Sequence, residues 1–337
     1  MKKWLKTILI GSITFLVLIS IISIINSDNP EYIIIGLRIL LSNYELVVFF
    51  LILFALAFFF RALRWNLLLL ENTKEKLYFY KLIYIAWFLN AVTPSRIGDL
   101  SRVYYPRKDN KSSAGNSLFA LIVDRLLDLS MLVFLLFFWL LYGFSFVDNE
   151  YQLWILIVVL GMISSFFFLI VLISFYPEVI EKWVKKLPNK TLQINLLKVI
   201  QNFNQGILSL KRTPIRFVAS IGLTISIWIL ESTSVFLIAR ALGFQIDFTI
   251  CMMAATLGFI GAAIPLLPGG LGSYEAGIGT VLLLLTPLTI QEAILIAFFD
   301  HMIRELFVIF VGGILFVFKK NDKNRLFSEE KQPEISM

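Results

Sequence analysis

The chain has 337 residues, of which 58% are hydrophobic and only 16% are charged, and it carries a formal net charge of +7. Soluble domains are about 25% charged, and several apolar runs here reach the ~18 residues that a membrane-spanning helix needs. The composition therefore excludes an ordinary soluble protein and predicts an all-α polytopic membrane protein. The positive charge does not indicate nucleic acid as a partner, because the basic residues cluster in short segments between apolar runs.

Six apolar segments are long enough to span a membrane, and polar or basic segments separate them. We expect the first to be retained, because it is too long for a signal-peptide core and lacks a clear cleavage site. The segments 31–43 and 190–210 look amphipathic and are predicted to lie on the membrane surface. The predicted spans are 7–25, 45–68, 117–143, 153–176, 217–238 and 292–318.

The basic residues also predict the orientation of the chain. Lysines and arginines gather before the first span, after the second, between the fourth and fifth, and after the last. Short segments of this kind stay in the cytoplasm, so both chain ends are expected there, in a multi-pass protein of the cell membrane. In this prediction residues 1–318 form one integral membrane domain, and residues 319–337 form a short cytoplasmic tail.

Two further apolar segments, 78–91 and 251–285, do not fit as simple spans, and each is associated with a helix breaker. The breakers are "TPSRIGD" at 93–99 and "LPGGLGS" at 267–273. Basic residues flank the first segment on both sides, and it is too short to cross the membrane. It is therefore predicted to be a re-entrant helical hairpin. By the same charge count, the second is a hairpin that enters from the opposite face.

The breakers suggest that the chain is an inverted repeat, with halves at about 1–145 and 150–318. Two other pairs of short motifs recur in the same order, "RAL" at 61–63 and 240–242, and "VDRLLDL" at 123–129 with "FDHMIRE" at 299–305. Each half would hold two spans, a hairpin and a third span. Many transporters are built from such repeats, and their broken helices meet near the bilayer centre. Pro94 and Pro268 suit the starts of the two returning helices.

Charged residues and glycines near the breakers are the candidates for contact with a ligand. An arginine beside a helix N-terminus can hold an anion such as a lipid phosphate. Charges within spans are costly and usually face the bundle interior. The candidate residues are Arg96, Asp99, Arg102, Asp124, Arg125, Asp128, Gly269, Gly270, Gly272, Glu275, Asp300 and Arg304.

Several of these residues have plainer interpretations. Arg102 fits a cytoplasmic loop equally well, and Glu275 fits a cap on the second returning helix. Asp128 fits a structural ion-pair network as well as a functional site, and the same holds for Glu305. Spacing along a helix predicts the pairs Arg125–Asp128, Asp300–Arg304 and His301–Glu305.

Glu231 stands alone in its span, where it is either a proton-linked carboxylate or a partner for Arg304 or Arg125. Arg61, Arg64 and Trp65 close the second span and are interpreted as interfacial anchors. One cysteine, Cys251, and one histidine cannot build a zinc site of the usual kind, and no GxxxxGK[ST] segment is present. We therefore expect no metal and no cofactor.

Four motifs in order, "RALRW", "NAVTPSRIGDLSR", "VDRLLDL" and "LPGGLGSYEA", resemble the flippase-like membrane domain of bacterial lysyl-phosphatidylglycerol synthases over roughly 5–318. This chain has Asp99 and Asp124 where the family pattern has glutamate, which keeps the charge but shortens its reach. The resemblance implies movement of a charged or glycosylated lipid between leaflets. Since only a short tail follows the last span, we do not expect lysyl transfer.

The sequence therefore predicts a lipid translocase whose partner is a membrane lipid with an anionic head group, and not an enzyme. Two alternatives stay open. One is an integral membrane transferase that uses Asp99, Asp124 or Asp300 as its base. The other is a membrane subunit that supports a separate lipid-modifying enzyme, such as a glycosyl- or aminoacyl-transferase.

Overall fold

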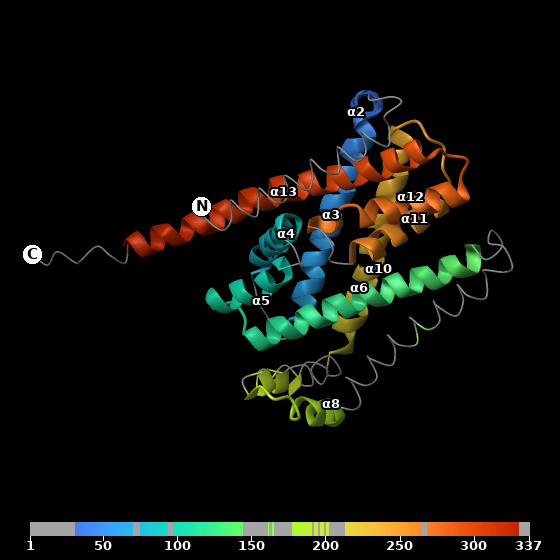
Figure 1. Ribbon diagram of the computed structural model, residues 1–337. Coiled ribbons are helices and arrows are strands. Elements are labelled where there is room, and N and C mark those ends of the chain that lie inside the picture. The colour runs from blue at the N-terminus through green and yellow to red at the C-terminus, as the bar shows by residue number, and fades with distance from the viewer. Residues whose placement is uncertain are drawn as a thin grey trace, which may run out of the picture.

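The computed structural model describes residues 31–69, 75–93, 97–143, 177–190, 213–263 and 268–329, with a few isolated positions between 161 and 201. Within these ranges every regular element is a helix (Figure 1). The predicted span 7–25 and the candidate Arg96 lie outside the described residues. The elements are α2 (Tyr32–Ser42), α3 (Tyr44–Leu68), α4 (Lys76–Val92), α5 (Gly98–Lys108), α6 (Ala114–Gly143), α8 (Pro177–Val184), α10 (Pro214–Ala241), α11 (Phe248–Ala263), η3 (Pro268–Gly270), α12 (Ser273–Leu285) and α13 (Ile290–Glu329).

Three of the described helices are long and apolar enough to cross a membrane: α3, α10 and the Ile290–Lys319 part of α13. They confirm the helices predicted at 45–68, 217–238 and 292–318. The segment 117–143 is also helical, as most of α6. The prediction for 153–176 falls outside the described residues except at two isolated positions. A helix of this kind satisfies its backbone hydrogen bonds within itself, which is what the apolar interior of a bilayer requires.

The helices α3 and α10 form the most extensive contact in the bundle, and they run antiparallel. Asn43, just before α3, donates a 2.8 Å hydrogen bond to the carbonyl of Ala241 at the end of α10. Further along, Arg64 of α3 donates to the hydroxyl of Thr224, at 2.8 Å, nearer the start of α10. The other helices are arranged around this pair, with α6 and α13 on different sides of it (Figure 1).

Both interrupted segments fold as helical hairpins, in which α4 packs against α5 and α11 packs against α12. Glycines allow the two arms to approach closely. A Cβ atom on Gly98 would lie 2.6 Å from the backbone nitrogen of Asn90 and nearer still to the carbonyl of Ala86. In the second hairpin, a Cβ on Gly277 would lie 2.6 Å from the carbonyl carbon of Leu257. Side chains at these positions would force the arms apart.

The returning helices begin later than the two prolines suggested. Pro94 lies outside the described residues, and α5 begins at Gly98. Pro268 begins only the short helix η3, and α12 starts at Ser273. The reason in the second hairpin is local, since Gly269, Gly270 and Gly272 have φ values of 66°, 79° and 83°. These left-handed conformations interrupt a right-handed helix, so α12 can start only after Gly272.

Contacts along α13 show that the two hairpins point toward one another. Lys319 bonds to Asp109, at the open end of the α4–α5 hairpin, and Gly312 lies against Tyr84 within α4. Toward the other end of α13, Glu305 lies beside Gly269 at the tip of the second hairpin. The tip helix η3 also contacts α4. The hairpins therefore enter the bundle from opposite ends of α13 and meet near its middle.

We predict that Gly98→Ala destabilises the protein by about 1–3 kcal/mol, because the new methyl group overpacks the α4–α5 contact. The measurement is thermal unfolding of the detergent-purified protein, followed by tryptophan fluorescence and by retention of a monodisperse chromatographic peak. The matched control is Gly222→Ala in α10, where a Cβ meets nothing within 4 Å. Equal unfolding temperatures for the two variants would contradict the close packing of the hairpin.

Candidate functional site: a buried ion-pair network

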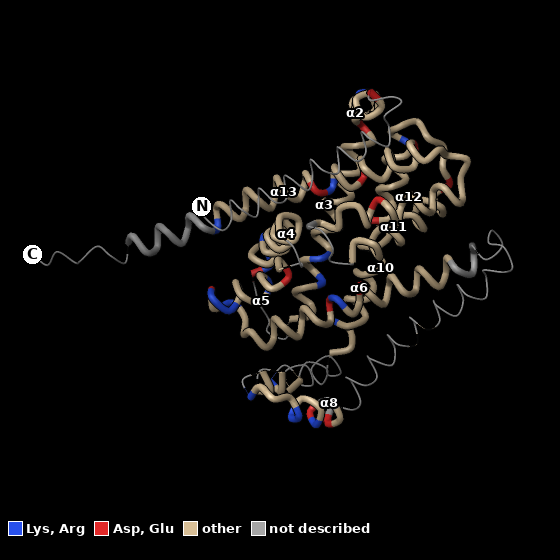
Figure 2. Tube along the Cα trace, in the orientation of Figure 1, with Lys and Arg blue, Asp and Glu red and all other residues tan. Residues whose placement is uncertain are grey.

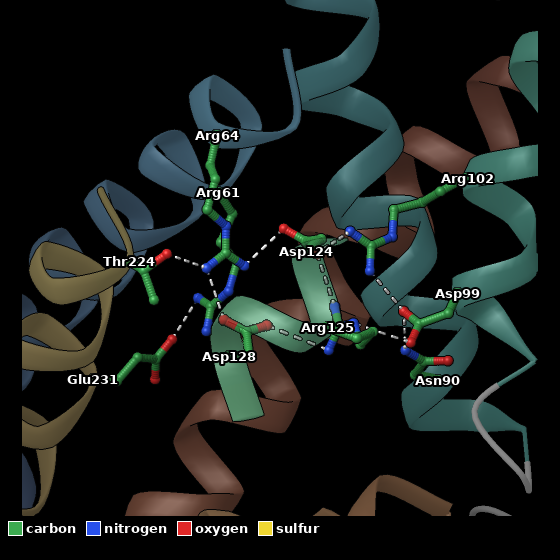
Figure 3. A network of polar contacts seen from close by, with 10 residues as sticks. All are labelled: Arg61, Arg64, Asn90, Asp99, Arg102, Asp124, Arg125, Asp128, Thr224 and Glu231. Carbon is green, nitrogen blue, oxygen red and sulfur yellow. Dashed lines mark hydrogen bonds and ion pairs between the residues drawn. The ribbon is translucent and has the colours of Figure 1, made fainter. Parts of the chain in front are cut away.

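Charged residues occur at positions inside the bundle as well as at its ends, as the coloured backbone trace in Figure 2 shows. A first group joins α3, α5 and α6, and Figure 3 shows it from close by. Asp124 of α6 lies at its centre and is 2% exposed. Its carboxylate accepts from Arg64 of α3 at 2.7 Å and from Arg102 of α5 at 2.8 Å. One carboxylate thus ties three helices together.

The two neighbouring aspartates extend this group in opposite directions. Asp128 lies one turn after Asp124 on α6, so both face α3, and it accepts from Arg64 at 2.8 Å. Asp99, on α5, accepts from Arg102 at 3.0 Å and from the amide of Asn90, at the tip of α4, at 3.2 Å. The first hairpin therefore contributes both of its arms to the network.

Arg125 has the loosest contacts among the arginines of this group. It faces all three aspartates, at 3.6 Å from Asp99, 3.3 Å from Asp124 and 3.6 Å from Asp128. Its side chain is 30% exposed, whereas those of Arg64 and Arg102 are 1% and 2% exposed. Each aspartate also has at least one closer arginine, so Arg125 is the cation that this group can release at least cost.

A second group joins α3, α10 and α13 around Glu231, which is 2% exposed. Arg61 of α3 binds one carboxylate oxygen at 2.5 Å, and Arg304 of α13 binds the other. Arg304 also binds Asp300 one turn earlier on α13, at 2.9 Å. The hydroxyl of Tyr274, on α12, donates to Asp300 at 2.6 Å, which connects the second hairpin to this group.

The only histidine in the sequence fixes the tip of the second hairpin. The Nδ1 atom of His301 lies 2.8 Å from a carboxylate oxygen of Glu275, and its Nε2 atom lies 3.2 Å from the carbonyl oxygen of Gly269. Glu275 also accepts a 2.7 Å hydrogen bond from the backbone of Gly272, which caps α12. Glu305, one turn after the histidine, lies 3.6 Å from Nε2.

The charges in the two groups balance. The first holds three arginines and three aspartates, and the second holds two arginines and two carboxylates. This balance is expected on physical grounds, because an unpaired charge in an apolar interior costs several kcal/mol.

Arg304 lies ~21 Å from the start of α13 and ~22 Å from Lys319, at a rise of ~1.5 Å per residue. It therefore lies at the middle of a helix long enough to span the membrane.

The structure brings together the candidates predicted from the sequence that fall within the described residues. Asp99, Arg102, Asp124, Arg125 and Asp128 belong to the first group. Asp300 and Arg304 belong to the second, and the remaining four form the tip of the second hairpin, namely Gly269, Gly270, Gly272 and Glu275. The three pairs predicted from helical spacing are confirmed, as is the cap formed by Glu275.

The interpretation of Arg61, Arg64 and Trp65 as interfacial anchors was wrong. All three are buried, at 8%, 1% and 0% exposure, and the arginines form the ion pairs described above. Trp65 instead lies under the guanidinium of Arg102, whose centre is 4.7 Å from the ring. Arg61 similarly lies over the ring of Trp87, at 4.6 Å. Arg61 and Arg64 pair with carboxylates on helices that are far away in the sequence. No local sequence pattern therefore predicts these contacts.

The structure also bears on two other expectations, namely the partners of Glu231 and the role of the glycines at the tip of the second hairpin. Of the two partners proposed for Glu231, Arg304 is confirmed, and Arg61 takes the place of Arg125. The backbone carbonyl of Gly269 contacts His301, and a Cβ atom on Gly270 would lie 2.7 Å from Ala262. These glycines therefore serve close packing of the tip in this structure. Within the described part of the chain, no cluster of three or more potential metal ligands is present.

The opposed hairpins and the long apolar helices around a paired polar core define a multi-pass helical membrane protein. Compared with known families, residues 7–312 match the family described as the lysylphosphatidylglycerol synthase TM region. The chain belongs to this family. The resemblance noted in the sequence motifs is thereby confirmed over nearly the whole chain.

Three curated relatives match parts of the chain. A UPF0104 membrane protein of Methanocaldococcus jannaschii is 26% identical, over 68% of this chain and 93% of that protein. A UPF0104 membrane protein of Pyrococcus horikoshii is 23% identical, over 75% of this chain and 81% of that protein. The glycosyltransferase AglD of Haloferax volcanii is 31% identical, but over only 28% of this chain and 16% of that protein. No solved structure matches the chain.

We predict that Glu231→Gln destabilises the protein by about 3–5 kcal/mol, because it leaves Arg61 and Arg304 buried with one carboxylate fewer. Chemical or thermal unfolding in detergent measures the change. Glu45→Gln is the control, on an exposed carboxylate in the first turn of α3. If both variants unfold alike, Glu231 does not hold the two arginines as described.

Proposed function

We propose that this protein translocates a lipid between the leaflets of the cell membrane, and that the lipid carries a phosphate-containing, aminoacylated or glycosylated head group. The observation that carries the proposal is the paired ionic network at the place where two opposed hairpins meet. A polar head group needs polar partners to pass through the apolar interior, and this network supplies them.

The arrangement of the helices supports an inverted repeat with two re-entrant hairpins. The order is a long helix, a hairpin and a second long helix in each half: α3, α4–α5 and α6, then α10, α11–α12 and α13. The hairpins enter from opposite ends of α13, and Asp124 and Asp300 occupy matching places in the two halves. Each accepts a hydrogen bond from the returning arm of its own hairpin. On this proposal six full spans surround the hairpins, and both chain ends are cytoplasmic.

Arg125 is the arginine that we assign to the head group. It is the most exposed of the arginines in the two groups, and its ion pairs in the first group are the longest. Its contacts with Asp99 and Asp128 are both 3.6 Å, which is longer than a hydrogen bond. A lipid phosphate can therefore take the place of the weak carboxylate contacts, because guanidinium binds phosphate through two parallel hydrogen bonds. Arg96 stays a predicted second contact, from the tip of the first hairpin.

The comparisons support a lipid as the substrate class. The family takes its description from a synthase named for a phospholipid, lysylphosphatidylglycerol. The match to AglD covers a small part of a protein named as a glycosyltransferase. This second observation favours one alternative, in which the chain is a membrane subunit that supports a separate lipid-modifying enzyme. An integral membrane transferase is less well supported, because each aspartate proposed as its base is already bound by arginine.

We predict that Arg125→Gln slows translocation by about 10- to 100-fold, which corresponds to the loss of one charge-assisted contact of ~1.5–3 kcal/mol. The measurement uses purified protein in liposomes that contain fluorescently labelled phosphatidylglycerol, with quenching of the outer leaflet by dithionite. The fold is expected to persist, because Asp99, Asp124 and Asp128 each keep another arginine. Unfolding temperature checks this directly.

The control for this experiment is Arg107→Gln, on the exposed face of α5. It removes the same charge from the protein without touching the network. Wild-type translocation by Arg125→Gln would remove the assigned site. Mass spectrometry of the recovered lipid separates the alternatives, since a changed lipid mass indicates an enzyme. If lipid neither moves nor changes until a partner enzyme is added, the chain is a subunit.

A further inference from the structure

A pocket of about 450 Å³ opens between α4 and α13, away from the central network. It lies where the first hairpin begins and where the spanning part of α13 ends. Lys319, which lines it, is ~22 Å along α13 from Arg304. The lining is of two kinds, with Glu75, Tyr78, Lys81 and Lys319 as its polar part, and Leu77, Leu82, Ile85, Leu315 and Phe318 as its apolar part.

Among the described residues, the charges around this pocket leave one lysine, Lys81, without an ion-pair partner. Glu75 is paired with Lys111, and Asp109 accepts from Lys319 at 2.6 Å. In the part of the chain that the structure describes, the carboxylates of this region pair with Lys111 and Lys319 and none pairs with Lys81, which is exposed. The pocket therefore presents one net positive charge that is available to a ligand.

Aromatic contacts hold the second lysine at the wall of the pocket. The ammonium group of Lys319 lies 4.5 Å from the centre of the Tyr78 ring and 4.9 Å from that of Tyr105. Tyr78 donates a 2.8 Å hydrogen bond to Asp109. Burial and this hydrogen bond raise the pKa of Tyr78, which keeps its hydroxyl neutral and able to donate. The polar wall is thus fixed by packing before any ligand arrives.

The apolar wall offers a surface against which a hydrocarbon chain can pack. Leu82 and Ile85 are buried beneath the pocket, while Leu77 and Phe318 at its rim are 64% and 62% exposed. Because α13 is apolar enough to span the membrane up to Lys319, this rim lies at the level where acyl chains meet head groups. Basic pockets between helices at this level bind the head groups of anionic lipids.

We propose that the pocket between α4 and α13 binds one anionic phospholipid, with its head group on Lys81 and its acyl chain against Leu77, Leu315 and Phe318. A free phosphate ion shares the head-group chemistry but makes no use of the apolar wall. The site is separate from the network around Asp124, and it does not depend on lipid translocation.

The test is retention of lipid by the purified full-length protein, measured by native mass spectrometry. The probes are phosphatidylglycerol, phosphatidylcholine of the same acyl chains, and inorganic phosphate as a competitor. We expect phosphatidylglycerol to be retained about fivefold more than phosphatidylcholine. This ratio corresponds to the attraction of about 1 kcal/mol between one lysine and an anionic membrane surface. Lys81→Gln is expected to remove this preference, and excess inorganic phosphate is expected to leave the lipid bound.

Lys76→Gln is the matched control, because Lys76 is also exposed near the start of α4 but does not line the pocket. It should retain phosphatidylglycerol as the wild type does. A second variant, Leu315→Trp, should lower retention of both lipids by filling the pocket, with unfolding temperature as the check on its fold. Equal retention by the Lys81 and Lys76 variants would overturn the proposal, and so would complete displacement of the lipid by inorganic phosphate.

Discussion

The need to pair every charge that is buried in an apolar bundle is the constraint on which this structure depends. A single ionised side chain in such a bundle costs several kcal/mol, whereas a well-formed pair recovers most of this cost. Each carboxylate of the network therefore requires a guanidinium, and the guanidinium comes from another helix in most cases. Asp124 holds α3 and α5 to α6, and Glu231 holds α3 and α13 to α10. These pairs determine which helices are neighbours. Packing between apolar side chains alone could not specify the same arrangement.

The hairpins extend the same constraint to the backbone. A chain that turns within a bundle leaves peptide groups without helical partners, and these groups need other partners. In the second hairpin the side chain of Glu275 accepts from the backbone of Gly272, and His301 contacts the carbonyl of Gly269. The same two side chains bind each other at 2.8 Å. The turn is therefore held by the polar side chains that surround it.

Much of the fold could be predicted from the sequence, because long apolar runs and helix breakers act locally. The three confirmed long helices and the two helical hairpins follow from the length of the apolar runs and from Gly and Pro. The pairs of Asp300 with Arg304 and of Arg125 with Asp128 follow from helical spacing. The roles of Arg61 and Arg64 could not be predicted in this way. Both lie near the end of an apolar run, where basic residues usually mark the membrane surface. Their burial depends on α10 and α6, which lie far away in sequence.

The two halves of the network are not equally tight, and this difference bears on the proposed transport. In the second group Arg304 has a 6% exposed side chain and binds two carboxylates and a serine hydroxyl. In the first group Arg125 is more exposed, and its three contacts are all long. An anion that bound Arg125 would weaken the hold of this arginine on Asp99, which lies on the returning arm of the first hairpin. Asp99 would keep Arg102 and Asn90, so the arm would stay attached while its position relative to α6 changed. Head-group binding on this side would thus act directly on one hairpin, as a mechanism of alternating access requires.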